Sequence, residues 1–115
     1  MSARSRSKGI RGELELAQFL TERGIPARRG CQRRGGYLSP DVDHGIEGVH
    51  LEVKRCESLR LWEAMDQAER DANRERVPVV AHRPNRRPWV AILKLDDFVR
   101  LCRDAGLIES EGASC

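Results

Sequence analysis

Glu52 and Lys54 stand two residues apart in a short apolar segment, Val49–Lys54, and this spacing could place both in a hydrolytic site. Side chains alternate between the two faces of a β-strand, so these two groups lie side by side while Leu51 faces the opposite way. A carboxylate can bind a metal ion, and a neighbouring ammonium can stabilise the charge that develops when a phosphodiester is cleaved. An ion pair on an exposed sheet face is the alternative interpretation.

A second carboxylate is available on the strand that is predicted to precede this one. Asp41 and Asp43 share a face opposite Val42, and a tight connection around Gly45–Gly48 would bring one of them next to Glu52. Converging carboxylates are hard oxygen ligands for Mg²⁺ or Mn²⁺, and such a metal lowers the pKa of a bound water. The pattern therefore predicts metal-dependent hydrolysis of phosphodiesters.

The first predicted helix carries a further acid on its apolar face. Glu13 falls among Leu14, Ala17 and Leu20 when residues are placed at helical spacing. A buried carboxylate costs free energy unless a cation or hydrogen-bond donors meet it, so Glu13 is predicted to belong to the site. The alternative is a side chain that snorkels at the edge of that face. Glu15 falls among polar residues and is predicted to face solvent.

Three polar residues near the predicted site have a less specific pattern. His44 and His50 could contact DNA or tune the site, but they are predicted to face solvent beside it. Gln67, on a later helix, could reach the site, although an exposed glutamine is the expectation.

The first third of the chain is basic. Residues 1–34 hold nine Lys and Arg against three Glu, whereas the whole chain has a net charge of only +3. Basic residues interspersed with Ser and Gly can follow a phosphate backbone, and a solvated basic surface is the alternative. The residues predicted to contact DNA are Arg4, Arg6, Lys8, Arg11, Arg28, Arg29, Arg33, Arg34 and Arg55.

The predicted elements alternate between helices and strands. Apolar periodicity and turn residues predict a helix over 8–23, strands over 27–29, 37–43 and 49–54, a helix over 59–76 with Ser58 as its N-cap, strands over 77–82 and 89–95, and a helix from 96 or 97 to 105 that ends at Gly106. This order predicts an α/β or α+β fold with a central mixed sheet flanked by helices.

The length of 115 residues fits one domain. We expect that domain over residues 8–109, between a flexible basic arm at 1–7 and a polar tail at 110–115. The sequence contains no stretch typical of a membrane span or signal peptide, which predicts the cytoplasm, or the host cytoplasm if the protein is viral. Four scattered cysteines are predicted to be free thiols.

Several short motifs together resemble one nuclease family. Lys8-Gly9, Glu13-Leu14-Glu15-Leu16, Gly24 with Arg28-Arg29, Pro40-Asp41-Val42 and Leu51-Glu52-Val53-Lys54 are similar to the archaeal-type Holliday-junction resolvases of the PD-(D/E)xK superfamily. The resemblance covers roughly residues 8–95 and implies a restriction-endonuclease-like core.

The resemblance also implies an activity and roles for four residues. Glu13, Asp41, Glu52 and Lys54 would be catalytic, with Asp41 and Glu52 as metal ligands and Glu13 and Asp43 as further candidates. Such an enzyme uses Mg²⁺, which Mn²⁺ can replace, and acts as a homodimer that nicks a four-way DNA junction symmetrically. The alternatives are a related nuclease for other branched or linear DNA, and a DNA-binding module that keeps the fold without catalysis.

Overall fold

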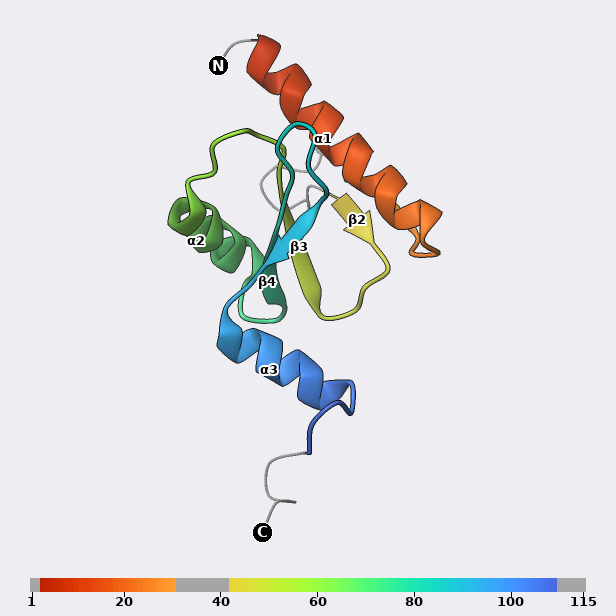
Figure 1. Cartoon of the computed structure of the whole chain (residues 1–115), viewed down its shortest axis with the longest axis vertical. Coiled ribbons are helices and arrows are strands. Elements are labelled where there is room, and N and C mark those ends of the chain that lie inside the picture. The colour runs from red at the N-terminus through yellow and green to blue at the C-terminus, as the bar shows by residue number, and fades with distance from the viewer. Residues whose placement is uncertain (1–2, 31–41, 110–115) are drawn as a thin grey trace.

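A computed structural model describes residues 3–30 and 42–109, with side chains from Gly9 onward within those ranges. Three helices are separated by groups of strands along the described chain (Figure 1). They are α1 (Ala3–Glu22), β1 (Ala27–Arg29), β2 (Val42–His44), β3 (Val49–Lys54), α2 (Leu61–Ala72), β4 (Val77–His82), β5 (Val90–Ile92) and α3 (Leu95–Asp104).

The central sheet is mixed, as the sequence predicts. β3 pairs with β4 in parallel, and β4 pairs with β5 in antiparallel orientation. Two parallel neighbours need a crossover connection, and α2 provides it between β3 and β4. β1 and β2 form a separate antiparallel pair, and β2 contacts β3. The fold is therefore α/β, with a mixed sheet flanked by helices.

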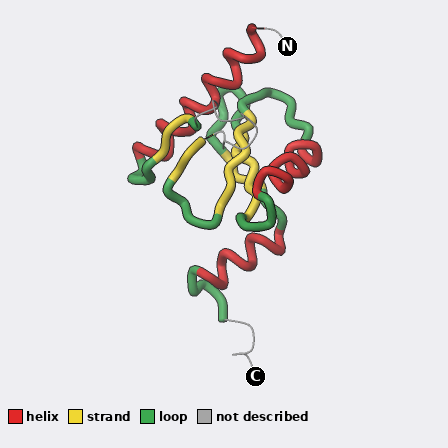
Figure 2. The backbone as a smooth tube through the Cα atoms, turned by 180° about the vertical axis from the view of Figure 1, so that it is seen from behind, coloured by secondary structure: helices red, strands yellow, loops and turns green. Residues whose placement is uncertain are grey.

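The alternation of β4 explains why helices cover both faces of the sheet. Val77, Val79 and Ala81 join a core with Leu16 and Leu20 of α1. Val80 faces the other way and packs against Ala64, Met65 and Ala68 of α2. A central strand buried on both faces reads as a nearly continuous apolar run, which is the character of Val77–His82. Figure 2 shows the strands between these two helices, with α3 projecting beyond one end of the sheet.

Two helices end in the same glycine motif. After α1 the N–H of Ile25 donates to the carbonyl of Leu20 and that of Gly24 to Thr21. After α3 the equivalent bonds run from Leu107 to Cys102 and from Gly106 to Arg103. Both glycines have positive φ angles, of 84° and 79°, as this helix termination requires. The predicted ends of these two helices are confirmed.

Several predicted boundaries differ from those observed. Strands over 49–54 and 77–82 are confirmed, whereas β5 covers only 90–92. The first helix begins at Ala3, inside the segment predicted to be a flexible arm. Ser58 is not the N-cap of α2, because the helix begins at Leu61 after Arg60. It ends before Asn73 and Arg74, whose φ angles of 54° and 62° break the helical conformation.

Two broader features complete the fold. Across the part of the chain that the structure describes, no helix is both long and apolar enough to cross a lipid bilayer. Cys56 and Cys102 are free thiols, as predicted. Cys31 and Cys115 lie outside the described residues.

Candidate active site

The polar face of β3 lies beneath α2 and not in solvent. His50 and Glu52 are only 4% and 2% exposed, and the His50 Nε2 atom lies 3.3 Å from Oε1 of Glu52. The prediction that His50 faces solvent is wrong, because α2 packs over this face of the strand. Burial makes any charge on Glu52 dependent on the groups around it.

Lys54 sits at the end of the same face. Its Nζ atom lies 4.0 Å from Oε2 of Glu52 and donates a hydrogen bond of 3.2 Å to the amide oxygen of Gln67. Gln67 belongs to α2 and is half-buried, so the expectation of an exposed glutamine is wrong. The juxtaposition of Glu52 and Lys54 predicted from strand alternation is confirmed.

Three side chains of this region could hold a cation together. One ligand atom from each of His50, Glu52 and Asp71 lies within 4.8 Å of the other two. Carboxylate oxygens and imidazole nitrogens are donor types that divalent metal ions accept. Asp71 was not predicted, although it stands four residues after Gln67 and so shares that face of α2. This i, i+4 polar pair is the sequence signal that could have found it.

Glu13 lies close to the core, as its position on the helix predicts. Its side chain is 14% exposed, and the Nε atom of Arg29 on β1 donates to its Oε1 at 2.8 Å. The Arg29 guanidinium is a charged partner of the kind that a carboxylate in this largely buried position needs.

Asp41 and Asp43 were the alternative partners of Glu52. Asp41 lies outside the described residues. Asp43 is exposed on β2 and its carboxylate stands 3.6 Å from Nε of Arg28, its cross-strand neighbour in the β1–β2 pair. Exposure and this ion pair do not by themselves favour Asp43 as a metal ligand.

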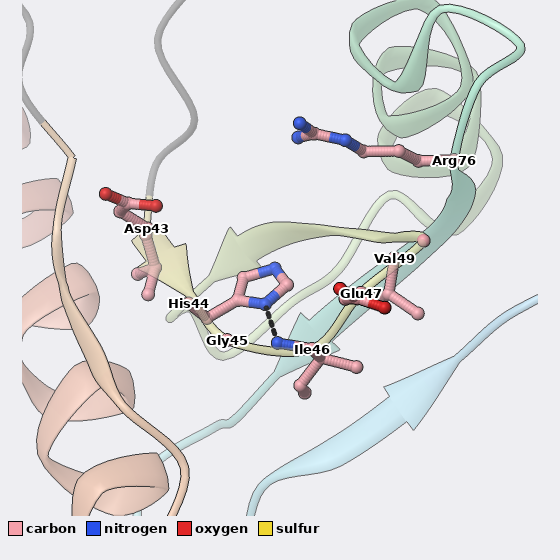
Figure 3. Close-up of a pocket in the computed structure, with 9 residues that line it drawn as sticks. Asp43, His44, Gly45, Ile46, Glu47, Val49 and Arg76 are labelled. Carbon is pink, nitrogen blue, oxygen red and sulfur yellow. Dashed lines mark hydrogen bonds between the residues drawn. The ribbon is translucent and has the colours of Figure 1, made fainter.

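A pocket adjoins Asp43 at the turn between β2 and β3. It is lined by residues 42–49 and Arg76, and Figure 3 shows the His44 ring between Asp43 and Arg76. The N–H of Ile46 donates to Nδ1 of His44 at 3.1 Å, so the ring closes the turn. Burial of the ring, and then the charges of His50 and Arg76, lower the pKa of His44.

The prediction that Glu15 faces solvent is wrong. Its Oε1 accepts from Nε of Arg55 at 3.0 Å and also from Nη1 of Arg83. Burial raises the pKa of Glu15, but the hydrogen bonds and charges of Arg83 and Arg55 outweigh burial and bring the pKa below its ordinary value. This carboxylate ties α1 to the ends of β3 and β4.

Gly12 allows α1 to approach the segment after β3. A Cβ atom at this position would lie 2.7 Å from the Cβ of Arg55, which is too close for two carbon atoms. The glycine therefore brings Glu15, one turn further along α1, within reach of Arg55 and Arg83.

The arginines predicted to contact DNA differ in whether a carboxylate already neutralises them. Arg28, Arg29 and Arg55 are each paired with a carboxylate, whereas Arg11 is exposed on α1. The side chains of Arg4, Arg6 and Lys8 are not described, and Arg33 and Arg34 lie outside the described residues.

Two arginines that the sequence did not single out are exposed in the turn that follows β4. Arg86 and Arg87 belong to the turn after β4, and their guanidinium groups make no ion pair within the described chain. The N–H of Arg83 donates to the carbonyl of Lys54, so this turn starts beside the candidate site.

Comparison with protein-family models, curated proteins and solved structures found no match for this chain.

Proposed function

We propose that the protein is a metal-dependent endonuclease that resolves four-way DNA junctions. The observation that carries the proposal is the nearly complete burial of Glu52 beside the ammonium of Lys54 on one strand. A buried carboxylate is costly to maintain, and a site that must hold a cation is a physical reason to keep one. With a restriction-endonuclease-like core, this pair would be the E-x-K of the active site.

A divalent ion fits the donors around Glu52. Glu52 and Asp41 would hold it, and His50 and Asp71 offer two further donor atoms within 4.8 Å of Glu52. When bound, the ion supplies a polarised phosphoryl oxygen and a more acidic water. We expect Mg²⁺ to serve, with Mn²⁺ able to replace it.

Lys54 and Gln67 would orient the reacting groups. The Gln67 amide accepts from Lys54 and so limits the positions of its Nζ atom. A fixed ammonium beside the scissile phosphate can stabilise the negative charge of the transition state. Glu13, held by Arg29, would complete the acidic group from the α1 side.

The exposed arginines suggest where the DNA backbone runs. Arg11 stands one turn before Glu15, and Glu15 binds Arg83 at the start of the turn that carries Arg86 and Arg87. Phosphate binding needs guanidinium groups that are not already neutralised, which favours these three over Arg28, Arg29 and Arg55.

Paired nicks in a four-way junction require two equal active sites. A two-fold dimer presents two sites to a substrate that has two-fold symmetry itself. We therefore include a homodimer in the proposal, with branched DNA as its substrate.

The decisive experiment compares a labelled four-way junction with linear duplexes of the same sequence, each with Mg²⁺ or with EDTA. We expect paired nicks in the junction alone, lost with EDTA and abolished by Glu52→Gln or Lys54→Met, while both variants still bind the junction. Glu63→Gln, an exposed carboxylate on α2, is the matched control and should cleave normally.

Two results would change the proposal. Equal cleavage of linear DNA would retain the active site but discard the junction as its preferred substrate. Normal cleavage by the Glu52→Gln variant would overturn the assignment of the site.

A further inference from the structure

The helix α3 exposes an apolar stripe along one face. Leu95, Phe98 and Val99 are 75%, 49% and 37% exposed, and Cys102 continues the same i, i+3, i+4, i+7 pattern. Neighbouring large apolar residues on one surface are uncommon in monomers and mark interaction sites. In Figure 1, α3 extends away from the sheet at the end of the molecule opposite the N-terminus of α1.

The attachment of α3 to its own domain uses a different part of its surface. Leu101 packs on the core, whereas no residue of α3 is buried. Around the helix Leu101 lies about 120° from Leu95 and about 160° from Val99, but only about 60° from Phe98, so the stripe borders the packed surface at Phe98 and turns away from it at Leu95 and Val99. The stripe is therefore available to another molecule.

We propose that the stripe binds the same stripe of a second copy, with the two α3 helices antiparallel about a two-fold axis. The charged residues beside the stripe are the reason for proposing a second copy as the partner. Asp96 and Arg103 are seven residues apart, or about two helical turns, so they lie on the same side of the stripe near its opposite ends.

In an antiparallel helix pair, the same side of the stripe comes together from both helices. The N-terminal end of one helix then faces the C-terminal end of the other. Asp96 of one copy would therefore face Arg103 of the second copy, and the two-fold axis would repeat that ion pair. Asp96 and Arg103 make no ion pair with one another or with any other residue in the described segments, and the buried Nε of Arg103 has no acceptor there. Phe98 and Val99 would lie at the centre of the contact.

This interface would supply the dimer that the proposed paired cleavage needs, but its test does not rest on cleavage. Sedimentation of the full chain, without DNA or metal, measures the dimer directly. We expect a dimer for the unmodified protein and a monomer for Phe98→Glu. Trp62→Glu is the matched control, since Trp62 is an exposed aromatic on α2 and should leave the dimer intact.

A charge exchange tests the antiparallel arrangement itself. Asp96→Arg places two guanidinium groups together across the interface, and Arg103→Asp places two carboxylates together, so each variant should raise the dissociation constant by about tenfold or more. A mixture of the two variants should form heterodimers, because every cross-pair then unites opposite charges. Circular dichroism of each variant confirms that it is folded.

Three outcomes would overturn the inference. They are a monomeric unmodified protein, a dimer that survives Phe98→Glu, and two folded charge variants that fail to associate when mixed. The first would mean that the stripe does not bind a second copy. Junction cleavage by such a monomer would leave the proposed nuclease site standing and reject only this interface.

Discussion

The amide oxygen of Gln67 lies 3.2 Å from the Nζ atom of Lys54. A residue of α2 therefore positions the ammonium group of a lysine on β3. α2 also contributes Asp71, one turn later, beside His50 and Glu52. The crossover helix thus serves two purposes, since it covers the sheet and supplies polar groups to the candidate site.

Replacing Gln67 should slow cleavage without preventing DNA binding. Gln67→Leu keeps the volume but removes the acceptor, and a misplaced Lys54 is expected to lower kcat by about tenfold to a hundredfold with little change in KM. Gln67→Glu, which restores an acceptor, should recover part of that loss. Gln18→Leu is the control, because Gln18 is an exposed glutamine on α1 whose side chain bonds Glu22 on the same helix. A change in KM alone would argue against a positioning role.

Glu15→Gln should remove a pH-dependent part of the stability. The folded pKa of Glu15 is below its ordinary value of 4.5, so its charged form stabilises the fold above that pH. This contribution is lost as the pH falls from 4.5 through the lowered folded pKa. At pH 7 we expect the variant to be less stable by about 1 kcal/mol, since about a third of the side chain is exposed and solvent screens its ion pairs.

Urea unfolding at pH 7 and near pH 3 would measure this effect. The unmodified protein and the variant should differ at pH 7, and the difference should shrink as the pH falls below 4.5 through the lowered folded pKa of Glu15. Glu22→Gln, an exposed change on the same helix, is the control. A difference that stays constant with pH would mean that the two arginines do not stabilise the charge.

Gly12→Ala and Gly9→Ala should have opposite effects on stability. Both glycines lie in α1, but an added Cβ meets Arg55 at 2.7 Å from Gly12 and nothing within 4 Å from Gly9. The first variant should lose about 1–3 kcal/mol through overpacking. The second should gain about 0.5–1 kcal/mol, because alanine favours the helix. Equal effects in thermal or urea unfolding would contradict this close approach of α1.

Arg86→Ala and Arg87→Ala should each weaken junction binding more at low salt than at high salt. Each exposed guanidinium that contacts a phosphate releases about one counterion, so the slope of log affinity against log salt should fall by about 1 per residue. Anisotropy measured with EDTA separates binding from cleavage. Arg70→Ala, an exposed arginine on α2, is the control, and an unchanged slope in the turn variants would place the DNA elsewhere.

Local patterns predict most of the fold. The alternation of Val49–Lys54 fixes β3 and the shared face of its acid and lysine, and the apolar run of Val77–His82 predicts β4 in full. Gly24 and Gly106 predict two helix ends, because only a residue free to adopt positive φ closes that motif easily. These strands and helix ends are specified by residues that are close together in the sequence, so they can be predicted without knowledge of tertiary packing.

The environment of single polar residues depends on packing and is harder to predict. Glu15 lies on the polar side of α1, yet Gly12 admits Arg55 so closely that the carboxylate finds two arginines there. His50 has the alternation of a solvent-facing residue, yet α2 covers it. In both cases a second element, distant in sequence, decides the environment of the side chain.

The Glu15 contact has a consequence for the order in which the chain assembles. Its partners Arg55 and Arg83 come 40 and 68 residues later, whereas β3, α2 and β4 make their contacts within the continuous segment 49–82. Closing the longer loops costs more entropy and delays the contacts that depend on them. During synthesis the contact of α1 with the ends of β3 and β4 can therefore be completed only after Arg83 has been made, later than the more local contact between Glu13 and Arg29.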